Sequence, residues 1–263
     1  MLLNKDKPAC AAGGAQTADR ALQILKYIAA EKGPVPIGLI CQEFELNRTT
    51  AWRLLSTLVN NGFIDRDVST KCYQLGLSSV LLCADAAAQN EPIIRHSRQA
   101  MEELAEITQE SVLLAVPKYN CTVTIAQVQS PLSIRLRDYI NTTSPLYGTS
   151  NGKMALSFLS EAELEKFLAL PRPPFTPQTI TDREQLIEEI NKTRERGFGM
   201  ILSELSESEN GVSAPIIYDK RPVAFISVAG PSFRFTEKRM FEVAPALISA
   251  CRRVEESFRV GMD

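Results

Sequence analysis

Apolar residues recur at intervals of three and four along the first 60 residues and predict three short helices. The predicted helices cover residues 18–32, a short stretch that starts at Pro36, and residues 48–60. Thr17 and Asn47 stand where helix caps are expected, and Pro36 suits a first helical turn. Gly62 can adopt the left-handed conformation that stops the third helix.

The third predicted helix has two unlike faces. One face is an apolar stripe that should pack against a core, made of Ala51, Leu54, Leu55 and Leu58. The other face is polar and carries no acidic residue. Two short strand-like runs follow at residues 63–64 and 72–75, with a polar stretch between them. Three helices and a hairpin predict a winged helix-turn-helix, whose third helix enters the major groove of DNA.

The pattern becomes mixed after residue 76. Alanine-rich residues 77–89 predict a linker helix, which Asn90–Pro92 should break before a further helix to about Thr108. Strands are expected at residues 111–116, 121–128, 133–137, 198–205, 212–217 and 223–229, and helices at 151–159, 162–169, 183–196 and 236–258. Hairpins with helices set apart predict an α+β fold, with a C-terminal antiparallel-sheet sensor domain of the GAF-like type.

These elements divide the chain into four expected segments. We expect a disordered arm in residues 1–16, a winged helix-turn-helix DNA-binding domain in 17–76, a linker helix in 77–90, and an effector-binding and oligomerisation domain in 91–263.

The composition is that of a globular protein with a real core: 44% of the 263 residues are hydrophobic and 23% are charged. No apolar run approaches the roughly 20 residues of a membrane-spanning helix, and the N-terminus does not resemble a secretion signal. We therefore expect a cytoplasmic protein with no membrane partner. The net charge of −2 mildly opposes nucleic-acid binding, but residues 46–64 carry only two charges, Arg48 and Arg53, both positive.

The six cysteines and the single histidine, His96, do not suggest a metal site. No two cysteines have the C-x-x-C spacing of a metal or redox site. We expect reduced, packed thiols, no metal and no cofactor.

Candidate DNA contacts come from the polar face of the third helix and from the wing. Both arginines of that helix would make charge-assisted contacts, the threonines at its start would reach phosphate or base edges, and the wing would hold the backbone. For Trp52, stacking on a sugar and packing on the wing both stay open. The full set is Arg48, Thr49, Thr50, Trp52, Arg53, Ser56, Arg66 and Lys71.

A second candidate site begins at Ser150. Ser150 and Lys153 match the S-x-x-K pattern of serine acyl-enzymes, but S-D-N and K-T-G partners are absent. The alternative is that Ser150, Asn151 and Gly152 open a helix whose free amides seat a carboxylate. In that case Lys153 either joins the site or forms a buried salt bridge.

Seven short motifs, in this order and spacing, resemble the IclR family of bacterial transcriptional regulators. They are Arg20–Leu25, Arg48–Leu58, Tyr73–Gly76, Gly152–Ala155, Arg194–Phe198, Ser213–Ile216 and Ser227–Pro231. The resemblance covers nearly all of the chain after residue 17. It implies homodimers, often paired into tetramers, that bind palindromic operators in double-stranded DNA and respond to small organic acids or related metabolites.

The resemblance also implies the rest of an effector pocket, formed by Leu136, Ile201, Leu202, Gly211, Ser227 and Ala229. Many family members have acidic residues in place of Ile201 and Leu202, and a cysteine near Gly211. The effector would therefore be more apolar, for example an aromatic acid, unless these side chains are core. We expect a ligand-responsive regulator, repressor or activator, of a catabolic operon. The alternatives are a serine hydrolase or amidase that uses Ser150 and Lys153, and a constitutive DNA-binding dimer without a ligand.

Overall fold

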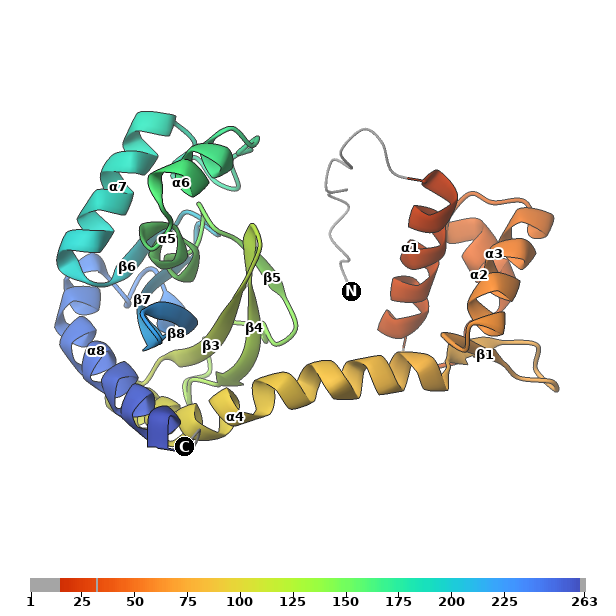
Figure 1. The fold of residues 1–263 in the computed structure, drawn as a ribbon, viewed down its shortest axis with the longest axis horizontal. Coiled ribbons are helices and arrows are strands. Elements are labelled where there is room, and N and C mark those ends of the chain that lie inside the picture. Colours follow the sequence, from red (N-terminus) through yellow and green to blue (C-terminus); the bar gives the residue numbers. More distant parts are fainter. Residues whose placement is uncertain (1–14, 32, 261–263) are drawn as a thin grey trace. The chain divides into compact units, whose positions relative to one another are not determined.

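The computed structural model describes residues 15–31 and 33–260, which form two compact units with their boundary between Gln89 and Asn90 (Figure 1). The predicted arm and the end of the first predicted helix, Lys32, lie largely outside the described residues. None of the described helices combines the length and the apolar character needed to cross a bilayer.

The first unit holds the expected three helices and hairpin. Helices α1 (Gln16–Ala30), α2 (Ile37–Glu43) and α3 (Arg48–Asn60) precede strands β1 (Ile64–Arg66) and β2 (Tyr73–Leu75). The two strands pair antiparallel. The side chain of Asn47 caps α3, and Gly62 is left-handed (φ 71°), as predicted. The three leucines of the apolar stripe of α3 pack into one core with Ile24, Ile28, Ile40 and Ile64.

The start of the first helix differs from the prediction. Ala15 occupies the N-cap position, and Thr17 lies inside α1 rather than capping it. No side chain caps this helix, and Asp19 in its first turn provides the negative charge that favours a helix N-terminus.

The predicted break at Asn90–Pro92 is wrong. Helix α4 runs without interruption from Leu77 to Thr108, with Pro92 inside it. A proline in a helix interior removes one backbone hydrogen bond and crowds the carbonyl four residues earlier, at a cost of about 3 kcal/mol. The residues beyond it, including Ile93, Met101 and Leu104, pack into the core of the second unit, and that packing holds the helix together.

A six-stranded antiparallel sheet forms the second unit, in the order β5-β4-β3-β8-β7-β6. Its strands are β3 (Ser111–Lys118), β4 (Cys121–Val128), β5 (Thr143–Pro145), β6 (Gly199–Leu202), β7 (Glu209–Tyr218) and β8 (Arg221–Pro231). Of these, β4 was predicted with its observed ends, and β3, β6, β7 and β8 were predicted with shifted ends.

The strand predicted at residues 133–137 does not form, and β5 was not predicted. Residues 129–142 follow an irregular path, because β5 already occupies the edge of β4. The apolar alternation of Ile134 and Leu136 imitated a strand. In the structure Leu136 is buried and Ile134 is exposed.

Helices cover both faces of this sheet (Figure 1). Helix α8 (Glu237–Val260) packs on one face with the second half of α4, around the larger core cluster. Helices α5 (Ser150–Ser157), α6 (Glu161–Leu168) and α7 (Arg183–Arg196) share a second core on the other face, which includes Phe225 of β8. These helices agree with the predicted ones to within two residues.

The start of α5 lies directly against the sheet. A Cβ atom on Gly199 would lie 2.3 Å from the backbone oxygen of Ser150, and one on Gly152 would lie 2.2 Å from the oxygen of Leu146. Both contacts are shorter than side chains tolerate. Gly199 therefore allows the N-terminus of α5 to approach β6 closely, and Gly152 allows α5 to pack on the backbone of Leu146 just before the helix.

Candidate nucleic-acid interface and ligand pocket

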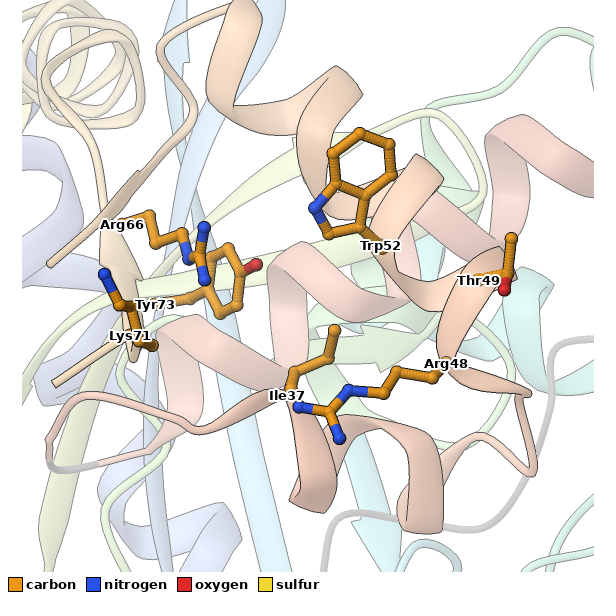
Figure 2. A pocket seen from close by; sticks show the side chains of 7 residues that line it. All are labelled: Ile37, Arg48, Thr49, Trp52, Arg66, Lys71 and Tyr73. Carbon is orange, nitrogen blue, oxygen red and sulfur yellow. The ribbon is translucent and has the colours of Figure 1, made fainter. Parts of the chain in front are cut away.

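A groove of about 400 Å³ lies between the polar face of α3 and the hairpin. Arg48, Thr49 and Trp52 of α3 line it together with Arg66 and Lys71 of the hairpin, and Ile37 and Tyr73 complete it. Figure 2 shows the two hairpin cations together on one side and Arg48 and Thr49 on the other. The groove thus combines three cations with no acidic lining residue.

The basic side chains of this surface form no ion pair with any described residue. Within the described part of the chain, no carboxylate lies within salt-bridge distance of Arg48, Arg53, Arg66 or Lys71. Arg66 stacks over the ring of Tyr73, 5.9 Å from its centroid. Free cations beside a helix N-terminus suit the phosphates and base edges of nucleic acid.

Trp52 is 54% exposed, so packing on the wing does not bury it. Thr50, Arg53 and Ser56 lie outside the groove. Arg53 is exposed on α3, whereas Thr50 and Ser56 are half-buried. The backbone amide of Thr50 donates to the Asn47 cap.

The tip of the hairpin is held by one carboxylate. Oδ1 of Asp67 accepts hydrogen bonds from the backbone amides and hydroxyls of Ser69 and Thr70, at 2.6 to 3.0 Å. These bonds, led by the Ser69 hydroxyl, lower the pKa of Asp67 to about 2. The turn that presents Lys71 is therefore pre-shaped at neutral pH.

A second cavity, of about 50 Å³, lies between the start of α5 and the sheet. Of the residues predicted to bind an effector, seven line it: Leu136, Ser150, Asn151, Ile201, Gly211, Ser227 and Ala229. Gly211 leaves space here, since an added Cβ would only make ordinary contacts with Ser150 and Ile201.

Two residues predicted for this pocket do not line it. Leu202 is 37% exposed, because it follows Ile201 in β6 and neighbouring residues of a strand point to opposite faces. Gly152 lies against the backbone of Leu146 and serves the packing of α5.

The first turn of α5 presents open polar groups to the cavity. Thr149 caps the helix by accepting from the amide of Gly152. The amides of Ser150 and Asn151 have no acceptor within the helix, and the Ser150 hydroxyl makes no hydrogen bond to any described residue. Helix N-termini with free amides favour an anion.

The cavity is also lined by residues that the sequence did not reveal. Tyr139 donates a hydrogen bond to Oε2 of Glu209 at 2.6 Å. Burial and the Glu209 carboxylate raise the pKa of Tyr139, so the phenol stays protonated and donates. Glu209 lies two residues before Gly211 on β7, and the strand period of two could have identified it.

Other missed lining residues are Leu113, Thr124, Ser144, Thr149, Leu205 and Asn210.

Lys153 turns away from this cavity. It is 1% exposed, and its Nζ donates to Oε1 of Glu204 at 2.6 Å, with Glu189 at 3.9 Å. Burial raises the pKa of Glu204, and the Lys153 ammonium opposes that shift. The structure thus decides between the two open readings of Lys153 in favour of the buried salt bridge.

A winged helix-turn-helix with a basic groove shares this chain with a sheet domain that holds a small, largely apolar pocket at the start of α5. This combination defines a ligand-responsive, DNA-binding transcriptional regulator. The family model for the bacterial transcriptional regulator IclR C-terminal domain matches residues 85–256, and the IclR helix-turn-helix model matches residues 17–68. The chain belongs to the IclR family.

Known relatives agree with this assignment. The chain is 28% identical to the transcriptional regulator KdgR of Escherichia coli, over 85% of this chain and 86% of KdgR. The crystal structure of Thermotoga maritima IclR is 26% identical and has a TM-score of 0.72, over 92% of this chain and 98% of that one. The crystal structure of an IclR homologue from Microbacterium hydrocarbonoxydans, solved with 4-hydroxybenzoate, has a TM-score of 0.74 at 20% identity. The match covers 93% of this chain and 99% of that one.

The buried ion pair yields a stability prediction. Lys153→Met should destabilise the protein by ~3–5 kcal/mol, because it leaves the Glu204 carboxylate buried without its cation. The double variant Lys153→Met/Glu204→Leu should recover most of that loss. Urea unfolding of the wild type, both single variants and the double variant measures the coupling. Additive effects of the two substitutions would show that the pair contributes nothing.

Proposed function

We propose that this regulator binds its operator as a homodimer through α3 and the hairpin, and that a short organic acid in the α5 pocket controls it. The observation that carries the DNA-binding surface is the groove lined by Arg48, Arg66 and Lys71. None of these three pairs with a carboxylate of the described residues. Thr49 and Trp52 supply polar and stacking contacts beside them. Arg53, Thr50 and Ser56 extend this surface along α3.

The proposed effector is a carboxylate seated on the free amides of Ser150 and Asn151. The oriented donors of a helix N-terminus and the hydroxyl of Ser150 favour an anion there. Ile201, Leu136 and Ala229 would contact the apolar part. The free volume of about 50 Å³ favours an effector with a short apolar part over one with an aromatic ring. A structural neighbour was nevertheless solved with 4-hydroxybenzoate.

The other candidate functions have less support. Acyl transfer by Ser150 needs an available lysine, and the ammonium of Lys153 is buried against Glu204. A dimer that needs no ligand would not require open polar groups at the start of α5.

The homodimer is proposed from the N-terminal part of α4. Leu77, Val80 and Leu81 are 67%, 55% and 57% exposed and lie at i, i+3 and i+4, so they form one apolar stripe. Two half-sites read by two copies would multiply the specificity of one winged helix.

Arg53→Ala should weaken specific DNA binding by ~1–3 kcal/mol and reduce the salt dependence by about one phosphate contact. Gel shifts on the DNA upstream of the protein's own gene, at several salt concentrations, measure both. Lys26→Ala removes an equal charge from the exposed side of α1 and should leave binding unchanged. Equal losses in the two variants would mean that only net charge matters.

Leu77→Asp/Leu81→Asp should convert the dimer to a monomer, because a dimer would bury four carboxylates, two from each copy, in an apolar interface. Light scattering at micromolar protein concentration measures the oligomeric state. Val68→Asp is the control, since Val68 is 83% exposed on the hairpin. A monomeric wild type with full DNA affinity would contradict the proposed dimer.

Ser150→Leu should weaken acid binding at least about tenfold, because it removes a donor and fills the cavity. It should leave DNA binding intact in the absence of the acid. Calorimetry with propanoate, pyruvate and benzoate compares short with aromatic acids. Ser157→Ala, at the other end of α5, is the control. If an acid alters DNA binding but its affinity survives Ser150→Leu, its site lies elsewhere.

A further inference from the structure

The ligand pocket carries one formally charged side chain, and that side chain is acidic. Glu209 is the only Asp, Glu, Lys or Arg among the residues that line it. A site that only accepted an organic anion would be expected to hold a cation or to be neutral. The position of Glu209 therefore needs an explanation, and it bears on the chemistry of the proposed effector.

The carboxylate of Glu209 is only half engaged by the protein. Its Oε2 accepts from Tyr139 at 2.6 Å, while its Oε1 accepts no hydrogen bond from any described residue. Tyr139 is itself held in place, since it packs with Leu113 and Leu136, and Arg137 lies 4.7 Å above its ring. The carboxylate is thus fixed in orientation, with one oxygen left for a donor.

A second polar group in the cavity also lacks a partner. Asn151 is only 8% exposed, its Nδ2 lies 3.4 Å from Oγ of Ser227, and its Oδ1 is buried without a hydrogen bond. Whichever way the amide is turned, one of its two polar atoms stays unpaired. Buried polar atoms without partners are rare in folded proteins, and Asn151 lines the same cavity as Glu209.

We infer that the effector is a monocarboxylic acid that also bears a hydroxyl or ammonium donor, and that Glu209 selects for this donor. This inference rests on the proposed acid seat at α5. The acid group occupies the helix amides, and the donor reaches Oε1 of Glu209. A hydrogen bond to a charged acceptor is stronger than one between neutral groups. A second carboxylate in place of the donor would instead be repelled by Glu209.

Three acids with one carbon frame test this selection: propanoate, 3-hydroxypropanoate and malonate. They differ only in the group at the third carbon, which is a methyl, a hydroxymethyl or a carboxylate. Calorimetry on the full-length wild type at neutral pH should rank 3-hydroxypropanoate first, tighter than propanoate by about tenfold or more. Malonate should bind most weakly.

Glu209→Gln separates selection from a structural role. Removing the charge should weaken the binding of 3-hydroxypropanoate, leave that of propanoate nearly unchanged and tighten that of malonate. The affinities for 3-hydroxypropanoate and malonate therefore move in opposite directions. A residue that only held the pocket in shape would move all three in the same direction. Glu207→Gln is the matched control, because its exposed side chain lies two residues away and outside the pocket.

The possible failures are distinguishable. If propanoate and 3-hydroxypropanoate bind the wild type equally, or if Glu209→Gln shifts all three acids together, the selection by Glu209 is wrong while the acid seat stands. If none of the three acids binds the wild type, both the short-acid seat and the selection are wrong. Opposite shifts for malonate and 3-hydroxypropanoate, absent in Glu207→Gln, establish Glu209 as the specificity residue.

Discussion

The ligand pocket depends on the buried ion pair between Lys153 and Glu204. A lysine that is 1% exposed must have an anionic partner, because an unpaired buried charge is too costly. The ion pair therefore holds the segment after β6, which contains Glu204, against α5, which contains Lys153. Thr176 and Thr179 hold the same segment by donating to the backbone oxygens of Ser203 and Glu204. The chain then continues directly into Glu209 and Gly211, so one ion pair in the core positions the wall of the cavity.

The two candidate sites use opposite electrostatic arrangements. The groove beside α3 is open and lined by unpaired cations, which suits a polyanion whose affinity falls with salt. The pocket beside α5 is small and mildly acidic, and both the first turn of α5 and the Glu209 carboxylate line it. It is suited to distinguishing similar small molecules by single hydrogen bonds. If ligand binding alters DNA affinity, DNA must alter ligand affinity by the same factor.

Local patterns predicted the winged helix-turn-helix well. The extent of α3 and its Asn47 cap were predicted correctly, because an apolar stripe, a capping residue and Gly62 all indicate the same helix. The same reasoning failed where packing overrode local preference. Pro92 does not break α4, since Ile93 and its neighbours are anchored in the second core. Residues 133–137 look like a strand but have no free edge to pair with, because β5 occupies it.

By itself, the sequence determined which short segments are helices, which surface of α3 is free of acids, and which family the motifs resemble. These properties depend on residues close together in the chain, where spacing translates directly into faces. Only the tertiary structure decided that Lys153 is paired with Glu204 and that Leu202 faces outward. It also decided that Tyr139 and Glu209, 70 residues apart, meet in the pocket. Contacts at such separations are set by the order and register of the strands, which no local pattern of residues encodes.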